Sequence, residues 1–316
     1  MSISFRSLFR ILWLGWIGSG LSPVWAGPVQ TLLEDWKDPT RDRTVPVKIY
    51  CPQELSEKNP LPVVLYSHGL GGSREIAQSI LSRWAQNGYI VIAVQHPGSD
   101  VSVWQGRPDG ISRLISAANA QQLLNRIQDI HFVLDHLQEL DSSGSHILHK
   151  KMNLSRISMT GHSFGAYTTL AVAGQTRTIG NKTLSTADPR ITCAIVMSPS
   201  PPSDKNPREF EKIRIPIFHM TGTKDTSPVQ PDLKPEDRTL PYQQIRASNQ
   251  YLVVFQDGDH MMFTGRGIMG RKYADLIVKS SVAFLDAFLK QDSNQKNWLD
   301  KEFVQELGPD GRFEHK

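Results

Sequence analysis

The sequence predicts an α/β fold in which helices cover both faces of a mainly parallel central sheet. Strand-like and helix-like stretches alternate from about residue 45 to residue 290, and this alternation is typical of such a fold. The inner strand-like runs are dense in β-branched residues and end in Gly or Pro, as buried parallel strands do. The chain has 316 residues, of which 39% are hydrophobic, and no repeat, low-complexity tract or long linker divides it. We therefore expect one large domain with a sizeable core.

Each expected element carries its own local signal. Residues 43–52 (RTVPVKIYCP) alternate in a way that suits an early edge strand, where Pro46 is tolerated. Residues 73–88 have helical periodicity and end in the Asn-Gly pair that stops a helix. Residues 119–140 place Leu, Ile and Val at the spacing of a helix with one core-facing stripe. The other expected strands are 61–69, 89–98, 156–161, 191–200, 214–222 and 250–260, and the other expected helices are 166–174 and 274–290.

The amino terminus has the composition of an export signal. Arg6 and Arg10 precede the apolar run ILWLGWIG, and a helix-breaking SGLSP and a site resembling a small-residue cleavage site follow it. That run is well short of the roughly 20 residues needed to cross a bilayer, so we expect a cleaved signal and no stable membrane span. The prediction is a signal peptide at 1–26 and a secreted or periplasmic protein. A single domain follows at 27–316, with a C-terminal tail from about residue 291.

Charge and motif content argue against several functions. The 35 basic and 31 acidic residues give a net charge of +4, too small an excess to indicate nucleic-acid binding. The sequence has no H-E-x-x-H motif, no Cys cluster and no Gly-Lys-Ser/Thr after its Gly-rich loop, so no metal or other cofactor is expected. His131 and His136 are five residues apart and do not share a helical face, so they are not expected to bind a metal ion together. Cys51 and Cys193 allow one bridge or two buried thiols, and we favour the thiols.

A serine between two glycines is the strongest functional signal. Residues 161–165 (GHSFG) fit the G-x-S-x-G pattern, in which a strand-to-helix turn lifts the hydroxyl of Ser163 above the sheet edge. The flanking sequence agrees, because a β-rich run precedes the motif and a small-residue helix start follows it. A side chain at Gly161 or Gly165 would crowd the turn. Ser163 is therefore the candidate nucleophile.

A serine nucleophile needs a base and an acid, and in this fold they follow the serine in the order acid, then histidine. Asp225 follows a strand in a Gly-x-x-Asp turn, and His260 ends the next strand. Asp259 is adjacent to His260 and would struggle to reach the far side of the same imidazole. Asp225 could also be a turn cap and His260 a loop residue. Four other strand-end histidines are expected to have packing or supporting roles: His68, His96, His162 and His219.

Acyl transfer also needs N–H groups that bind the developing negative oxygen. The loop 68–72 (HGLGG) follows an early strand, so the main-chain N–H groups of Leu70 and Phe164 are the candidate donors. Loops beyond the carboxyl ends of the strands should form the pocket. The candidate apolar wall for the acyl group consists of Phe164, Trp104, Met261, Met262 and Phe263.

With these motifs in place, the sequence resembles the α/β-hydrolases, and more closely the exported platelet-activating-factor acetylhydrolase and bacterial predicted dienelactone hydrolase group. The resemblance rests on RDRTVPVKIYCP, VVLYSHGLGGSRE, YIVIAVQHPGSD, GHSFGAYT and DGDHMMF, and it covers most of residues 36 to 290. It implies the α/β-hydrolase fold, a carboxylic ester hydrolase and no cofactor.

The sequence departs from this group at two positions. Dienelactone hydrolases have cysteine in this strand-to-helix turn, called the nucleophile elbow, where this chain has Ser163. In the acetylhydrolases the acid follows the strand after the elbow helix, but here that stretch offers no aspartate until Asp204. Both departures favour a serine esterase with Asp225 as its acid.

We thus expect an exported serine hydrolase that cleaves lipid-like or short-acyl carboxylic esters through an acyl-enzyme. An acyltransferase with the same triad and an inactive hydrolase fold that only binds a lipid or partner are the alternatives.

Overall fold

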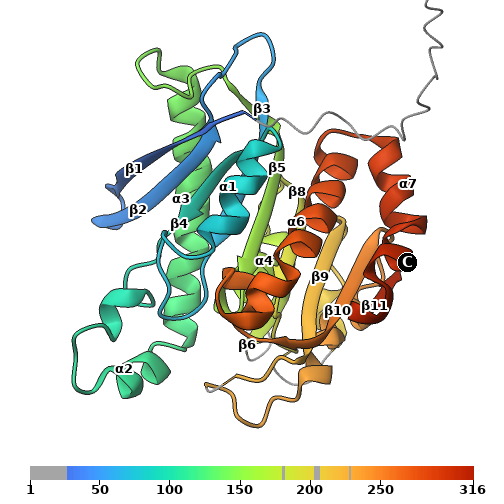
Figure 1. Cartoon of the computed structure of the whole chain (residues 1–316). Coiled ribbons are helices and arrows are strands. Elements are labelled where there is room, and N and C mark those ends of the chain that lie inside the picture. The colour runs from blue at the N-terminus through green and yellow to red at the C-terminus, as the bar shows by residue number, and fades with distance from the viewer. Residues whose placement is uncertain (1–26, 180–181, 203–206, 228) are drawn as a thin grey trace, which may run out of the picture.

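The structure is a computed structural model that describes residues 27–179, 182–202, 207–227 and 229–316. The export signal expected at 1–26 lies outside the described residues. Within them, nine strands form one sheet in the order β1-β2-β4-β3-β5-β8-β9-β10-β11 (Figure 1). The strands are β1 (Val29–Asp38), β2 (Arg43–Pro52), β3 (Leu61–Ser67), β4 (Ile90–Val94), β5 (Met152–His162), β8 (Ile191–Met197), β9 (Ile217–Lys224), β10 (Gln250–Asp259) and β11 (Gly311–His315).

The centre of this sheet is parallel and its edges are antiparallel. Neighbouring strands from β4 through β3, β5, β8 and β9 to β10 run parallel, whereas the pairs β1-β2, β2-β4 and β10-β11 run antiparallel. This arrangement confirms the predicted fold class, the α/β-hydrolase fold. Because the carboxyl ends of parallel strands meet at one edge of the sheet, the loops that follow β3, β5, β9 and β10 converge there.

Helices cover both faces of the sheet, as expected. Four of the helices that pack against it are α1 (Gln78–Gln86), α3 (Ala120–Ser142), α4 (Phe164–Ala173) and α6 (Gly267–Leu289). Side chains of α1 and α6 share one buried apolar cluster with strands β3, β4 and β10. Side chains of α3 and α4 pack in a second cluster on the opposite face. Figure 1 shows α1 and α6 in front of the sheet and α3 behind it.

The chain ends differ from the expectation. Residues 43–52 do form β2, but β1 pairs along its whole length, so β2 is not at the edge. The chain from about residue 291, expected as a tail, contains α7 (Ser293–Lys301), α8 (Phe303–Leu307) and β11. β11 adds to the sheet beside β10, and Phe303 and Leu307 are buried in the core. The carboxyl-terminal residues therefore belong to the domain.

Both cysteines are free thiols, as expected. Cys51 and Cys193 are unpaired and buried, and they lie in the apolar clusters on opposite faces of the sheet. Burial raises the pKa of the Cys51 thiol to about 11, so it is not a ready nucleophile near neutral pH. In the part of the chain that the structure describes, we find no helix with the length and apolar character to cross a membrane.

Candidate active site

Ser163 lies at a sharp turn between β5 and α4. Its backbone angles are φ 57° and ψ −116°, a strained conformation for a residue other than glycine. A Cβ at Gly161 would collide with the carbonyl oxygen of Gly165, and a Cβ at Gly165 would collide with that of Ser67. The two glycines thus let the start of α4 pack against the end of β3, which holds the serine at the sheet edge.

Three side chains from distant parts of the sequence meet at this turn. His260 Nε2 is 3.0 Å from Ser163 Oγ, and His260 Nδ1 is 2.7 Å from Asp225 Oδ1. Asp225 directly follows β9 and His260 directly follows β10. These distances allow the imidazole to accept the serine proton while the carboxylate accepts a hydrogen bond from Nδ1–H. The structure therefore brings together all three residues singled out from the sequence.

The environment of Asp225 keeps it ionised. Burial raises its pKa, but the hydrogen bond from His260 and the charge of Arg238 together lower it by more, so the pKa lies below the ordinary aspartate value. Thr221 Oγ1 donates a hydrogen bond of 2.8 Å to Asp225 Oδ2. Asp259, the adjacent carboxylate, instead accepts a hydrogen bond from the main-chain N–H of Met261. The alternative acid Asp204 lies outside the described residues.

Arg238 is a site residue that the sequence reading missed. It lies in the short 3₁₀ helix η3 (Pro235–Thr239) of the loop after β9, and it is almost completely buried. Its Nε is 2.8 Å from Asp225 Oδ1, and its Nη1 donates to the carbonyl of Ser198 at 2.9 Å. Its Nη2 is 3.3 Å from His260 Nδ1. The charge of Arg238 therefore helps to keep Asp225 ionised.

We expect Arg238→Gln to move the acidic side of the pH–rate profile to higher pH by about one unit. The charge of Arg238 lowers the pKa of Asp225, so without the guanidinium this pKa rises. The carboxylate that orients His260 is then protonated, and its support lost, at a higher pH than in the wild type. The measurement is kcat/KM against pH, with Lys224→Gln as the control, because Lys224 is an exposed cation paired with Asp257. An unmoved acidic side would contradict the effect assigned to Arg238.

The candidate oxyanion donors lie beside the serine. A Cβ at Gly69 would be 3.4 Å from Ser163 Cβ, which shows how closely the loop after β3 approaches the elbow. Among the described residues, no protein acceptor is found for the main-chain N–H of Leu70 or of Phe164. Both groups are thus free to bind a substrate oxygen. The helix α4, which begins at Phe164, adds the positive end of its dipole at this point.

The expected apolar wall divides into exposed and buried residues. Trp104 is 42% exposed and its Nε1 donates to the carbonyl of Gly71, so it lies against the oxyanion loop. Met261 is 49% exposed. Met262 and Phe263, in contrast, pack in the core with no exposed surface, so they do not form an open wall. The sequence could not show which of these four side chains line a pocket and which pack in the core, because apolar side chains are suited to both.

The four remaining strand-end histidines are all buried, in keeping with supporting roles. His162 Nε2 is 2.8 Å from the carbonyl oxygen of His260, so its ring supports the loop that carries the base. Burial and the nearby charge of His260 lower the pKa of His162 to about 3, which keeps it neutral. In the residues that can be described, no group of three or more His, Cys, Asp or Glu side chains could hold a metal ion.

Comparison with known proteins identifies similar sequences. Residues 30–104 match the family model described as platelet-activating factor acetylhydrolase, isoform II. A platelet-activating factor acetylhydrolase of Cavia porcellus is 26% identical over 292 residues, and this match covers 80% of the present chain. The match spans 63% of the relative's own length. The family-model match includes the loop 68–72 and ends before Ser163.

Proposed function

We propose that the chain, which has the α/β-hydrolase fold and is similar to the platelet-activating factor acetylhydrolases, is a serine hydrolase of carboxylic esters. The observation that carries the proposal is the hydrogen-bonded series from Ser163 Oγ through His260 to Asp225, at 3.0 and 2.7 Å. A structural role would not require a strained serine beside two N–H groups for which no acceptor is found among the described residues.

The reaction follows from this geometry in two steps. Ser163 Oγ attacks the ester carbonyl as its proton passes to His260 Nε2, and the carbonyl oxygen gains a negative charge that the N–H groups of Leu70 and Phe164 bind. The imidazolium then protonates the leaving alkoxide, and the acyl group stays on Ser163. Water attacks the acyl-enzyme and gives a proton to His260. The imidazolium then returns this proton to Ser163 Oγ as the bond between Oγ and the acyl group breaks and the acid is released. Asp225 stays ionised and holds the imidazole in place throughout.

The exposed surface near the site favours a lipid-like or short-acyl ester as the substrate. Trp104 and Met261 are large exposed apolar side chains, and Ile111 and Ile115 are exposed on α2 (Gly110–Ser116). The indole of Trp104 and the side chain of Leu114 lie against Gly71, so this segment covers the oxyanion loop.

We further propose that residues 1–26 direct export, which would place the enzyme outside the cytoplasm.

The proposal is tested by labelling with a fluorophosphonate, which reacts with an activated serine. We expect one covalent adduct, located on Ser163 by mass spectrometry of the digested protein. Aryl esters from acetate to long acyl chains, with a phospholipid alongside, then define the acyl preference. Absence of labelling in a folded protein would favour an inactive fold that only binds a ligand. New esters formed on adding alcohols, at the expense of hydrolysis, would favour an acyltransferase.

A further inference from the structure

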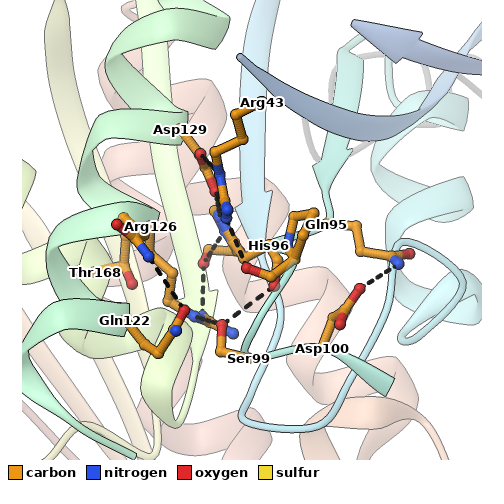
Figure 2. A network of polar contacts seen from close by, with 12 residues as sticks. Arg43, Gln95, His96, Ser99, Asp100, Gln122, Arg126, Asp129 and Thr168 are labelled. Atoms are coloured by element: carbon orange, nitrogen blue, oxygen red, sulfur yellow. Dashed lines mark hydrogen bonds and ion pairs between the residues drawn. The ribbon is translucent and has the colours of Figure 1, made fainter. Parts of the chain in front are cut away.

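A buried guanidinium lies behind the candidate oxyanion site, and the role inferred for it below rests on the proposed function. Arg126 projects from α3 and has no exposed surface. Figure 2 shows it reaching from the helix towards Ser99. Its Nε donates to Ser99 Oγ at 2.8 Å, and its Nη1 donates to the carbonyl of His68 at 2.7 Å. The side chain thus lies where the loop after β3 meets the loop after β4.

Arg126 contacts the peptide group that carries one of the candidate donors. Its Nη2 is 3.4 Å from the carbonyl oxygen of Gly69, and this carbonyl belongs to the same peptide unit as the N–H of Leu70. The same oxygen accepts a hydrogen bond of 3.0 Å from the N–H of Gly72. It also lies 2.6 Å from Nδ1 of His68. Donors on the carbonyl side fix the direction of the N–H and strengthen it as a donor.

The second candidate donor is linked to the same side chain. The guanidinium carbon of Arg126 lies 4.5 Å from the centre of the Phe164 ring, a cation–π contact. Phe164 is the first residue of α4 and directly follows Ser163. One guanidinium therefore contacts the Gly69–Leu70 peptide, whose N–H is one candidate donor, and the ring of Phe164, whose main-chain N–H is the other.

Within the described part of the chain, no direct ion pair neutralises the charge of Arg126. All of its hydrogen-bond acceptors found among the described residues are neutral groups. Asp129, three residues along α3, is already bound to Arg41, Arg43 and His96 at 2.9, 2.7 and 3.0 Å. Figure 2 shows Asp129 together with Arg43 and His96. A buried charge without a partner costs free energy, which a neutral residue in a purely structural role would avoid.

Arg126 nonetheless stays charged under ordinary conditions. Burial lowers its pKa to about 9, while the charges of Asp129 and Asp100 act in the opposite direction. At neutral pH the guanidinium is therefore protonated, and its field reaches the elbow through a poorly screened interior.

We propose that Arg126 is a positioning residue of the oxyanion site. It holds the Gly69–Leu70 peptide and the Phe164 ring in place, and its charge strengthens the stabilisation of the negative oxygen in the transition state. This role predicts a loss in kcat with little change in KM, because the oxyanion exists only in the transition state.

The test compares Arg126→Met with Arg126→Lys. Met removes the charge and the hydrogen bonds, so we expect kcat for an aryl ester to fall by about 10²-fold, as for loss of one oxyanion donor. Lys keeps a cation without the planar fork, so we expect a smaller loss of about tenfold. In both variants KM should change by less than about threefold. A trifluoromethyl ketone, which forms a charged adduct with Ser163, should lose affinity in parallel with kcat. Its alcohol analogue, which forms no adduct, should not.

The matched control is Arg190→Met, which removes an arginine that pairs with Asp188 and Asp135 far from the site. It should lower the melting temperature without lowering kcat. If Arg126→Met does not fold, Arg126→Lys decides alone. Unchanged kcat and ketone affinity in the folded variants would overturn the inference while leaving the proposed function intact. A wild-type protein without esterase activity would instead refute the proposed function itself.

Discussion

Ser163→Ala is expected to lower kcat for a simple aryl ester by about 10⁶-fold, which leaves little more than the rate that substrate binding and the oxyanion donors provide. The substitution removes the only atom that can form the acyl-enzyme, so hydrolysis would have to proceed by direct attack of water. Binding and the oxyanion donors would still provide a small residual rate. The measurement is kcat at saturating substrate, with the concentration of active protein set by fluorophosphonate titration of the wild type.

The fold should survive this change, because alanine replaces serine without adding volume at a turn that glycines on either side already permit. Ser163 makes no side-chain cap for α4, so the helix loses no hydrogen bond. A control is Ser143→Ala, at an exposed position after α3. Both variants should melt within a few degrees of the wild type. Turnover retained by Ser163→Ala in a contaminant-free preparation would remove the nucleophile assignment.

The parts of the site that the sequence predicts well are those with a local cause. The pattern around Ser163 predicts a strand-to-helix turn because only small residues fit there, and the collisions of a Cβ at Gly161 and Gly165 show the reason. Asp225 and His260 could be placed because each follows a β-rich run, and parallel strands end at one edge. Each of these inferences needs only the few residues around the position.

The residues that the sequence reading missed are those whose role depends on tertiary packing. Arg238 lies in a proline-rich loop without any motif, and only the fold brings it to Asp225. Arg126 did carry a signal, because it falls on the same helical stripe as Leu123, Ile127 and Ile130. A charged residue on a core-facing stripe indicates a buried polar role, and this pattern could have been noticed.

The expected edge strand illustrates a different limit. β1 has a mixed composition, VQTLLEDWKD. Every second residue from Thr31 to Lys37 is exposed to solvent, so the hydrophobic signal of the strand is weak. Pro46 suggested an edge because it lacks an N–H. In the structure Pro46 lies just beyond the β2-β4 ladder, which begins at Val47, and its carbonyl still accepts a bond from Gln95. The proline was compatible with an interior strand.

Asp225→Asn is expected to lower kcat by about 10⁴-fold. The carboxylate accepts a hydrogen bond from His260 Nδ1, and this bond leaves Nε2 free to take the serine proton. An amide NH₂ facing Nδ1 would favour the other tautomer, in which Nε2 carries the hydrogen and cannot act as a base. The amide also lacks the negative charge that stabilises the imidazolium. The measurement is kcat in a preparation whose folded fraction is determined by circular dichroism.

Two matched substitutions separate this effect from a general loss of negative charge near the site. Asp259→Asn changes the carboxylate next to His260, which accepts a hydrogen bond from the N–H of Met261 in its own loop. Asp204→Asn changes the acid position favoured by the resemblance to the acetylhydrolases. Both should retain most of the wild-type rate. In Asp225→Asn the amide oxygen at the Oδ2 position still accepts a hydrogen bond from Thr221 Oγ1, and Arg238 Nε still donates to the main-chain carbonyl of residue 225. This variant should therefore fold, and its lost rate should report chemistry. If Asp204→Asn were the inactive variant, the catalytic acid would be Asp204 and not Asp225. Only one carboxylate can accept the hydrogen bond from His260 Nδ1.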